Sequence, residues 1–518
     1  MRYVVQSALG VLAGGVGLLM MSSVAQAASC SAWDAAKAYV GGEYVKYDNK
    51  AWRAKWWSQN EVPGSNQWGP WETRPMSECT DDGGGGGGGG GPAEPPEPTP
   101  TVGKHVGAYF TQWGIYARGY PVRKLVDSGG YKKLTFLNYA FGNVYADGKC
   151  GMVTRTESGS GDGGDAAADY QKTFNADQSV DGVGDQWSDK LRGNFNQLRK
   201  LKFKNNNLKV LISLGGWTWS RNFGKFAATA AGRQAMVASC IDIYLKGNLP
   251  VVEGAGGQGV ARGIFDGIDI DWEFPGGGGL ADNSVDPNDK RNFTLLMAEF
   301  RRQLDELGAK NKRRYYLTVA VGAGADKIRN TEPGEYSKYL DWVNVMTYDF
   351  FGAWVPSGPA QFHSHLYRDP AAPNTGDQAA YNVNDAVQAL VNAGMPRVKL
   401  NVGIPFYGRG WRGVAAGPNG NGLYQSAGGA AAGTYEAGIE DYKVLKSRSG
   451  SRFYHPVTKQ LWLYNGNEFW SYDDPTVIGT KLNYINQQNL GGAFTWSLDG
   501  DDPQGTLLNA VSALRGGQ

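Results

Sequence analysis

The chain beyond residue 101 is predicted to be an α/β protein, a (β/α)₈ TIM barrel, on three observations. Apolar, strand-like runs alternate with amphipathic helical stretches along residues 102–518. Eight such runs occur, which suits a barrel of this length. No glycine-rich nucleotide loop follows any run, which disfavours the runner-up, a doubly wound open sheet. The predicted strands are residues 104–110, 134–141, 208–214, 263–273, 316–321, 343–348, 399–404 and 492–497.

Helices are predicted between these strands, where apolar residues recur at helical spacing, as at 191–204, 226–245, 291–307 and 383–393. The connection between the seventh and eighth strands is longer than one crossover helix requires. Between about residues 408 and 488 it carries aromatic residues in short alternating runs. We therefore expect a small inserted α+β subdomain there, walling one side of a cleft.

Residues 1–27 have the pattern of a secretory signal peptide. Arg2 supplies the basic start, residues 9–21 the apolar core, and Ala25-Gln26-Ala27 a small-x-small cleavage site. The mature chain is therefore expected to be secreted and extracellular. Cys30 follows the cleavage site, but the leucine-rich box of lipoprotein signals is missing. No later apolar run approaches the ~20 residues that span a bilayer, so no membrane association is expected.

A linker over residues 83–101 is predicted to separate two domains. Nine consecutive glycines, at 83–91, make its first part flexible, and the proline-rich run that follows is extended and semi-rigid. Residues 28–82 form a small β-rich domain dense in aromatic residues. A domain of this size cannot bury so many large rings, so some are expected to form a binding surface.

The charge and the aromatic content bear on the class of ligand. Lys and Arg number 51 against 49 Asp and Glu, and no long basic run occurs. This balance argues against nucleic acid and favours a neutral substrate. The chain has 17 Trp and 27 Tyr, and aromatic faces are well suited to pack against sugar rings. The alternative is that many of these rings only fill cores.

Four cysteines are expected to meet an oxidising environment, and three pairings are possible. Cys30 and Cys79 bracket the small domain and are the predicted pair, because a bridge would stabilise a domain with little core. Cys150 and Cys240 are left open between a second bridge and two buried thiols. The four histidines show no metal-ligand spacing beyond His363 and His365, so no catalytic metal is expected.

The fourth predicted strand carries the strongest signal for a site. Asp269, Asp271 and Glu273 alternate with apolar residues, so the period of a strand puts all three carboxyl groups on one face. Like charges this close cannot all ionise, and a protonated acid beside ionised ones suits acid-catalysed bond cleavage. The alternative is a strand whose acids face solvent at a sheet edge. Asp266 lies at odd spacing from the other acids and is expected to be structural.

Asp266, Asp269, Asp271 and Glu273 match the motif Asp-x-x-Asp-x-Asp-x-Glu, through which residues 102–518 resemble glycoside hydrolase family 18, the bacterial chitinases. Residues 44–47 and 54–59 resemble the small chitin-binding modules of families 5 and 12. Further matches to family 18 lie at the predicted strand ends: Asn138-Tyr139-Ala140-Phe141, Ser213-Leu214-Gly215-Gly216-Trp217, Met346-Thr347-Tyr348-Asp349, Pro405-Phe406-Tyr407-Gly408-Arg409-Gly410 and Gly492-Ala493-Phe494-Thr495-Trp496-Ser497.

The resemblance implies a retaining, substrate-assisted hydrolysis of β-1,4 bonds between N-acetylglucosamine units. Glu273 is expected to protonate the glycosidic oxygen and later to act as a base toward water. The nucleophile would be the carbonyl oxygen of the substrate's own N-acetyl group, which Tyr348 would hold in line. Asp271 would stabilise the positive charge that develops, and Asp269 would share a proton with Asp271.

The resemblance also implies residues that contact the sugars. Trp496 would form the floor under the distorted ring, and ordinary packing at the barrel end is the alternative for it and for Tyr348. Trp217, Tyr407 and Arg409 would contact flanking sugars, with surface packing as the alternative. The remaining predicted residues are Asp349 and Met346 beside the distorted sugar, Tyr109 and Ser213 in support of Asp269, and Trp56, Trp57, Trp71 and Tyr44 on the chitin-facing surface of the small module. Adjacent residues of a strand face opposite ways, so either Trp56 or Trp57 is expected to belong to the core instead.

The expected partners are chitin and N-acetylglucosamine oligomers, with no cofactor and a monomeric chain. Two other functions stay open. A non-catalytic chitin-binding lectin on the same barrel usually loses the terminal acid, whereas Glu273 is present. An endo-β-N-acetylglucosaminidase would cleave the core of N-linked glycans with the same motif. The module and the inserted subdomain both favour chitin as the substrate.

Overall fold

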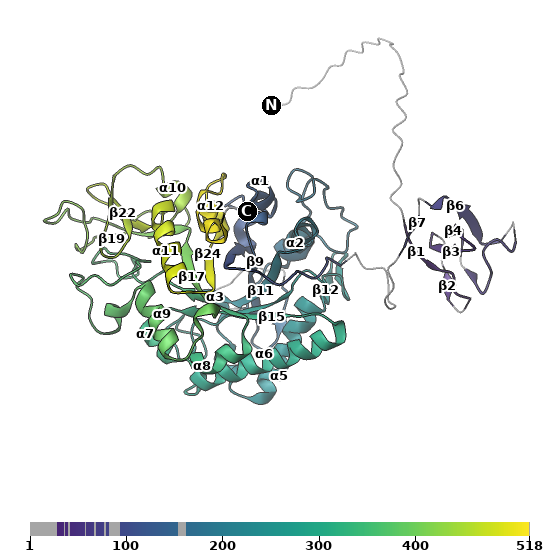
Figure 1. Cartoon of the computed structure of the whole chain (residues 1–518), viewed down its shortest axis with the longest axis horizontal. Helices are drawn as coiled ribbons and strands as arrows, with labels where there is room; N and C mark the ends of the chain where they lie inside the picture. Colours follow the sequence, from purple (N-terminus) through teal and green to yellow (C-terminus); the bar gives the residue numbers. More distant parts are fainter. Residues whose placement is uncertain are drawn as a thin grey trace, which may run out of the picture. The chain divides into compact units, whose positions relative to one another are not determined.

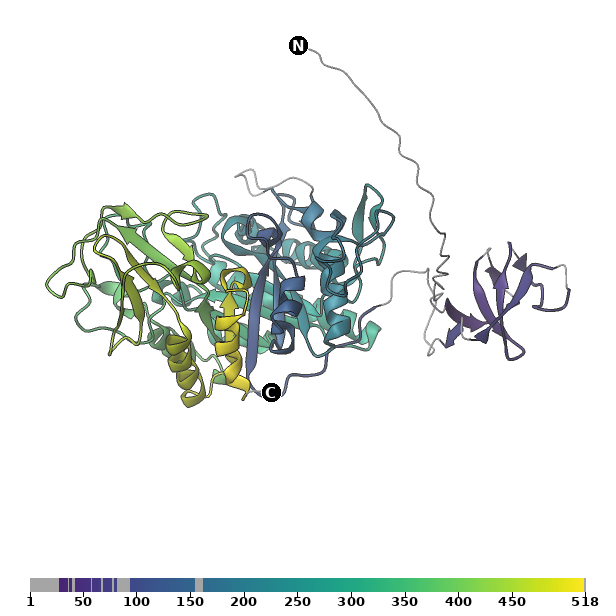
Figure 2. The same cartoon turned by 90° about the horizontal axis from the view of Figure 1, so that it is seen from above.

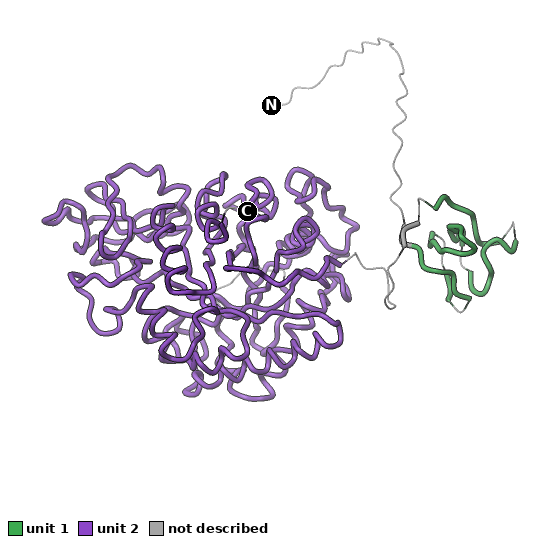
Figure 3. The backbone as a smooth tube through the Cα atoms, in the orientation of Figure 1, with its two compact units in different colours: residues 1–90 green, residues 91–518 purple. Residues whose placement is uncertain are grey.

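The structure is a computed structural model that describes residues 28–35, 37–39, 42–56, 58–66, 69–76, 79–81, 94–153 and 162–516. The chain divides into two compact units, residues 1–90 and 91–518, which Figure 3 colours separately. The predicted signal peptide, Trp57 and the glycine run lie outside the described residues. No helix among the described residues is long and apolar enough to cross a membrane.

The larger unit is a closed barrel of parallel strands, as the sequence predicts (Figure 1). Each strand pairs with the next, and the last, β24, pairs with the first, β8, which also pairs with β9. The short strand β10 (Cys150–Gly151) adds to β9 in antiparallel sense. The barrel strands are β8 (His105–Thr111), β9 (Phe136–Val144), β11 (Lys209–Gly215), β14 (Gly267–Asp271), β15 (Tyr316–Gly322), β16 (Trp342–Met346), β17 (Leu400–Pro405) and β24 (Gly492–Trp496).

Helices surround this barrel. The main hydrophobic core lies between the strands and the helices, and a smaller aromatic cluster that includes Phe136, Trp342 and Phe494 fills the barrel itself. Figures 1 and 2 show the last two helices, α11 and α12, side by side. The helices are α1 (Arg123–Asp127), α2 (Gly193–Lys204), α3 (Gly216–Trp219), α4 (Phe223–Ala227), α5 (Ala230–Cys240), α6 (Asp289–Asn311), α7 (Ala325–Arg329), α8 (Pro333–Tyr336), α9 (Val383–Asn392), α11 (Pro475–Gln487) and α12 (Thr506–Ser512).

The helix predicted over 226–245 is confirmed over residues 230–245, but it is interrupted near its predicted start. α4 ends at Ala227, and Thr229 then caps a new helix, α5, by accepting a hydrogen bond from the backbone N–H of Gly232. A π-helical turn, η5 (Ile241–Leu245), completes the segment. A threonine side chain that satisfies a free backbone donor is a local signal for a helix start, and it outweighs the continuous apolar pattern here.

The predicted insertion between the seventh and eighth strands is confirmed. It is a six-stranded antiparallel sheet with one short helix, α10 (Tyr442–Leu445), at one edge of the unit (Figure 2). Its first strand, β18, begins at Tyr407, directly after the seventh barrel strand. The strands are β18 (Tyr407–Arg412), β19 (Gly429–Ala430), β20 (Ile439–Asp441), β21 (Ser451–Tyr454), β22 (Leu461–Tyr464) and β23 (Phe469–Tyr472).

A disulfide joins Cys150 of β10 to Cys240 of α5, with an S–S distance of 2.01 Å. This decides between the two alternatives that the sequence leaves open for these cysteines. Cys30 is also disulfide-bonded. The side chain of Cys79 lies outside the described residues, so the pairing of Cys30 with Cys79 stays a prediction. The strands that contain them, β1 (Ala28–Ala32) and β7 (Cys79–Asp81), are neighbours in one sheet.

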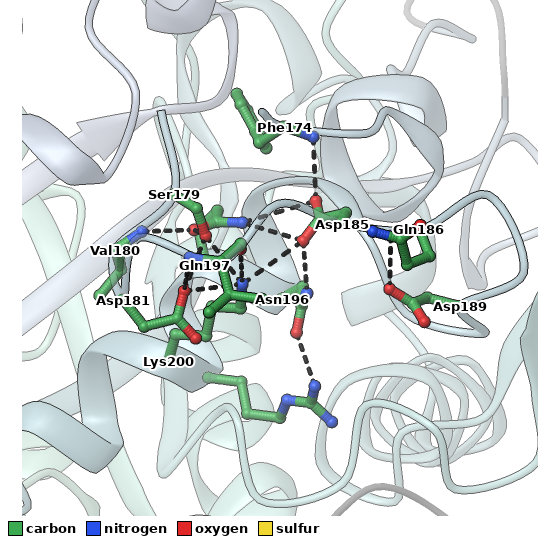
Figure 4. Close-up of polar contacts among 12 residues, drawn as sticks. Phe174, Ser179, Val180, Asp181, Asp185, Gln186, Asp189, Asn196, Gln197 and Lys200 are labelled. Carbon is green, nitrogen blue, oxygen red and sulfur yellow. Dashed lines mark hydrogen bonds and ion pairs between the residues drawn. The ribbon is translucent and has the colours of Figure 1, made fainter. Parts of the chain in front are cut away.

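A polar network orders the long connection that precedes α2 (Figure 4). The carboxylate of Asp185 accepts hydrogen bonds from the backbone N–H of Phe174 and from the side chains of Asn196 and Gln197 on α2. The Lys200 ammonium lies 3.7 Å from the same carboxylate. Side chains of α2 therefore hold a connection that is longer than usual for a strand-to-helix link.

The second half of the predicted linker lies against the barrel. In this strap, residues 94–101, Glu94 pairs with Arg262, and Lys209 donates hydrogen bonds to the backbone oxygen of Thr99 and the hydroxyl of Thr101. Two prolines of the strap, Pro95 and Pro98, are buried. Lys209 begins β11 and Arg262 precedes β14, so the strap covers the N-terminal end of the barrel. It is therefore part of the barrel unit and not of a free tether.

We expect the strap to stabilise the barrel. A chain beginning at residue 94 should keep the melting temperature of the barrel, whereas one beginning at residue 102 should melt a few degrees lower. The reason is that removal of the strap exposes Lys209, which is 1% exposed in the structure, together with the surface under the two prolines. Differential scanning calorimetry of the two truncations measures the difference. Equal melting temperatures would show that the strap contacts contribute nothing.

The smaller unit is a five-stranded sheet with a short two-stranded ribbon. Its core contains Tyr39, Val45, Ala54 and Trp71. In addition to β1 and β7, the sheet contains β3 (Tyr44–Tyr47), β4 (Lys50–Ala54) and β6 (Trp71–Arg74), and the ribbon pairs β2 (Ala38–Tyr39) with β5 (Ser58–Gln59).

Candidate active site

The three predicted carboxylates lie along and just beyond β14, at the C-terminal end of the barrel. Ile268, Ile270 and Trp272 face outward and are buried, and Trp272 stacks on Phe223 of α4 with ring centroids 5.6 Å apart. Burial of this apolar face fixes the register of the strand, which turns the alternate acids toward the barrel interior. The alternative of acids facing solvent at a sheet edge is wrong, because β14 is paired on both sides and buried throughout.

Asp269 is the innermost acid and is fully buried. Its neighbours in the register are Ser213 on β11 and Thr318 on β15, and both donate hydroxyl hydrogen bonds to its carboxylate. Tyr109 of β8 donates a third, at 2.7 Å. Burial raises the pKa of Asp269, and these donors oppose the rise. The structure thus brings Tyr109 and Ser213 onto Asp269, as the resemblance implies.

Asp271 is the middle acid and ends the strand. It is 4% exposed, and its Oδ1 has no hydrogen-bond partner among the described residues. Burial, followed by the nearby charges of Glu273 and Asp269, raises the pKa of Asp271 well above its usual range. A buried carboxyl oxygen without a donor is costly to the fold, and such groups cluster where a ligand supplies the missing partner.

Glu273 lies two residues beyond the strand, which ends at Asp271 and not at Glu273 as predicted. The reason is that the Glu273 N–H donates to the hydroxyl of Ser220 at 2.8 Å instead of to a neighbouring strand. Its backbone oxygen accepts from Asn283, also at 2.8 Å. Burial, followed by the charge of Asp349, raises the pKa of Glu273 to about 8. A half-buried carboxyl that keeps its proton at neutral pH can act as a general acid.

Asp349 follows the end of β16, and two residues of β18 hold it. The Tyr407 hydroxyl and the Arg409 Nε donate to its Oδ1 at 2.7 and 2.8 Å. Burial alone would raise the pKa of Asp349, but the Arg409 guanidinium and His363 hold it well below the usual range. Asp349 is therefore a fixed negative charge beside Glu273. Tyr407 is 8% exposed, so its position favours a role in holding Asp349 over contact with a sugar.

A cleft of about 1270 Å³ runs over this end of the barrel. Trp496 lies in it, stacked on Phe141 with ring centroids 5.6 Å apart and an angle of 20° between the rings. Aromatic faces at such a position suit the apolar faces of sugar rings. Nine predicted residues line the cleft, namely Tyr109, Trp217, Asp271, Glu273, Met346, Tyr348, Asp349, Arg409 and Trp496, whereas Asp269, Ser213 and Tyr407 lie behind it.

Several cleft residues were not predicted from the sequence. Trp113 and Trp354 are 40% and 54% exposed. Trp113 comes just after β8, so a search for aromatic residues at strand ends finds it, whereas Trp354 lies further along the loop that follows β16. Tyr381 and Glu436 also line the cleft. They come from a distant loop before α9 and from the inserted subdomain, and no local pattern marks them.

The smaller unit presents some of its predicted surface. Trp56 is 51% exposed, and Tyr44 is half-buried. Trp71 is only 5% exposed, packs on Tyr39 at a ring distance of 5.1 Å and donates its indole N–H to the backbone oxygen of Glu61. The prediction that Trp71 faces the ligand is therefore wrong, because its ring forms the core of the unit. Trp57 lies outside the described residues.

No group of three or more His, Cys, Asp or Glu side chains in the described ranges is arranged to hold a metal ion. The four histidines of the chain are instead distributed over packed positions. His363 and His365 lie in one segment but their rings meet different neighbours, Tyr407 for His363 and Phe350 for His365.

Two family profiles match the chain. The profile described as glycosyl hydrolases family 18 matches residues 105–501, which cover the barrel and its insertion. The profile of carbohydrate-binding module family 5/12 matches residues 32–72 of the smaller unit.

Curated relatives and solved structures agree with these profiles. Chitinase C of Streptomyces lividans is 43% identical over 401 residues, which are 77% of this chain and 57% of that protein. Chitinase 63 of Streptomyces plicatus is 42% identical over 422 residues, 80% of this chain and 62% of the relative. The chain thus spans about three fifths of the length of these relatives. The catalytic domain of a psychrophilic chitinase B from Arthrobacter TAD20 is 43% identical with a TM-score of 0.75, and covers 80% of this chain and 95% of that structure.

Proposed function

The chain belongs to glycosyl hydrolase family 18, and on this premise we propose that it is a chitinase that hydrolyses β-1,4 bonds between N-acetylglucosamine units with retention at the anomeric carbon. The observation that carries the proposal is that the three acids have different surroundings. Asp269 accepts several hydrogen bonds, Asp271 has a buried oxygen without a donor, and Glu273 lines the cleft. The relatives named chitinases support the substrate class.

In the first step, Glu273 donates its proton to the glycosidic oxygen as the bond from that oxygen to the anomeric carbon breaks. The carbonyl oxygen of the sugar's own N-acetyl group attacks the anomeric carbon from the opposite side and forms an oxazolinium ion. The Glu273 carboxylate then takes a proton from water, and that water attacks the same carbon and reopens the ring. Two displacements at one carbon give retention.

Asp271 supplies the acceptor and the charge that this intermediate needs. We propose that its oxygen without a partner accepts the acetamido N–H and that its negative charge stabilises the positive ring. Because its pKa is raised so strongly, Asp271 holds a proton in the free chain, and we propose that it passes this proton to Asp269 and ionises as the substrate's charge develops. Tyr348, which lines the cleft, is proposed to hold the acetamido carbonyl, and Trp496 to lie under the distorted ring.

The proposed acid gives a prediction for the pH dependence. The chain should be fully active only while Glu273 is protonated, so kcat/KM should fall as the pH rises through about 8. Initial rates on a soluble N-acetylglucosamine oligomer between pH 3 and pH 10 test this. A decline centred near pH 4 to 5, the ordinary value of a glutamic acid, would mean that the surroundings of Glu273 do not raise its pKa.

We also propose that the chain is secreted, as its first residues imply, and that the smaller unit binds insoluble chitin. Deletion of residues 28–93 should leave activity on short soluble oligomers nearly unchanged and lower the degradation of crystalline chitin, because the module raises the local concentration of the barrel at the surface. This deletion keeps the strap on the barrel. If activity on soluble oligomers falls with it, the module is part of the active site.

Product analysis over time tests the proposal as a whole. Incubation with a soluble N-acetylglucosamine oligomer should yield shorter oligomers with new reducing ends. Binding without cleavage would support the lectin alternative. Release of glycans from a glycoprotein without cleavage of the oligomer would support the endo-β-N-acetylglucosaminidase alternative.

A further inference from the structure

His363 is fully buried directly behind the cleft, and no part of the mechanism above uses it. Its imidazole is 0% exposed, and neither ring nitrogen has a hydrogen-bond partner among the described residues. A buried ring with two unpartnered nitrogens is costly, and in native proteins such a group calls for a specific explanation.

The backbone of His363 is fixed between the barrel and the inserted subdomain. Its N–H donates to the hydroxyl of Ser471 on β23, and its carbonyl oxygen accepts from the N–H of Phe350, which follows β16. The next residue, Ser364, donates to the backbone oxygen of Thr347 and accepts from the ammonium of Lys481 on α11. These contacts fix the backbone from which the His363 ring projects.

The His363 ring points at Asp349. The His363 Nδ1 lies 3.7 Å from Asp349 Oδ1, the same oxygen that accepts from Tyr407 and Arg409. The His363 ring also packs against the Tyr407 ring, with centroids 5.2 Å apart. Three groups thus converge on one oxygen of Asp349, while the side chain remains 37% exposed and lines the cleft.

We propose that His363 is a positioning residue: its Nδ1–H donates a hydrogen bond to the same oxygen of Asp349 that accepts from Tyr407 and Arg409. The other oxygen of Asp349 stays free to face the cleft. A shift of less than 1 Å completes the third hydrogen bond. The inference rests on the proposed function, because the three hydrogen bonds fix the position of the Asp349 charge, which acts on Glu273 and on the sugar.

Burial, and not the balance of nearby charges, keeps His363 a neutral donor. Asp349 follows β16 and Asp473 follows β23, and both favour the protonated ring, whereas Arg409 on β18 opposes it. Burial exceeds these effects and lowers the pKa of His363. A neutral imidazole carries a single N–H, and the carboxylate at Nδ1 selects the Nδ1–H tautomer.

Nitrogen NMR tests this assignment without reference to activity. The chain has only four histidines, so histidine labelled with ¹⁵N gives a small set of ring signals, and the signal lost in His363→Phe identifies the residue. We expect a neutral, Nδ1-protonated ring from pH 7 to pH 9, whose shifts change in Asp349→Asn. An Nε2-protonated ring, or shifts that ignore the Asp349→Asn change, would overturn the proposal.

Kinetics supply the second readout, with His365 as the matched control. His365 lies in the same segment and is 7% exposed, but its ring packs on Phe350 and Phe362 instead of facing Asp349. His363→Phe should lower kcat/KM on a soluble oligomer by about tenfold or more. The same substitution should move the alkaline limb of the pH profile to lower pH. The reason is that a displaced Asp349 raises the pKa of Glu273 by less than the correctly positioned carboxylate does.

The control and rescue variants separate positioning from packing. His365→Phe should leave the pH profile unchanged whatever it does to the melting temperature, and His363→Gln, which keeps a donor, should recover most of the lost rate. In an Asp349→Asn background, His363→Phe should have little further effect.

An active His363→Phe variant with the unsubstituted pH profile would show that His363 only packs. Lack of cleavage by the unsubstituted chain would count instead against the proposed function, and the NMR result would still decide the tautomer.

Discussion

Replacing Glu273 with Gln is expected to abolish hydrolysis of N-acetylglucosamine oligomers while leaving the fold and oligomer binding intact. The amide keeps the shape of the side chain but cannot deliver a proton, and general acid catalysis is typically worth 10² to 10⁴ in rate. The fold should survive because the hydrogen bonds that fix this residue, from its N–H to Ser220 and from Asn283 to its carbonyl oxygen, involve its backbone.

The measurement is the turnover of the variant on a soluble oligomer, with calorimetric binding of the same oligomer as the control for a competent cleft. Retention of more than about a hundredth of the original turnover would rule out Glu273 as the acid. Loss of binding together with turnover would indicate a damaged cleft and not a missing proton donor.

Replacing Asp271 with Asn is expected to lower kcat by about 10² to 10³, through loss of the charge that stabilises the oxazolinium ion. The same change should not destabilise the fold, and at neutral pH it should raise the melting temperature. The raised pKa of Asp271 means that its burial opposes folding at pH values above the ordinary pKa of an aspartic acid, and a neutral amide avoids that cost.

The sign of this stability effect can be checked by its pH dependence. The gain in melting temperature for Asp271→Asn should be present at pH 7 and should vanish below about pH 4, where the aspartic acid is protonated in the unfolded chain as well. Thermal melts at the two pH values provide the comparison. A variant that loses stability at pH 7 would show that the Asp271 carboxylate has a structural partner in the folded chain.

The barrel and its acids could be predicted because each follows from a local pattern. The alternation of acids with Ile268, Ile270 and Trp272 in one strand determines which face is buried, and the structure buries that apolar face as expected. The eight strands begin and end within a few residues of their predicted bounds. In each case the information lies in neighbouring residues.

The parts that could not be predicted depend on contacts between distant segments. The aromatic content of the small domain does not show that Trp71 is the ring that turns inward, because this follows from its packing on Tyr39. The proline-rich strap has the composition of a linker, yet Lys209 and Arg262 hold it on the barrel. His363 has no local signal at all, since Asp349 and Ser471 meet it only in the folded chain.

The anomeric configuration of the first product tests the central claim most directly. The proposed mechanism requires two displacements at one carbon, with the substrate's acetamido group as the nucleophile of the first. Early-time proton NMR of the hydrolysis of a soluble N-acetylglucosamine oligomer should therefore show the new reducing end as the β-anomer, before mutarotation mixes the forms. Initial formation of the α-anomer would mean a single displacement by water and would contradict the proposed mechanism.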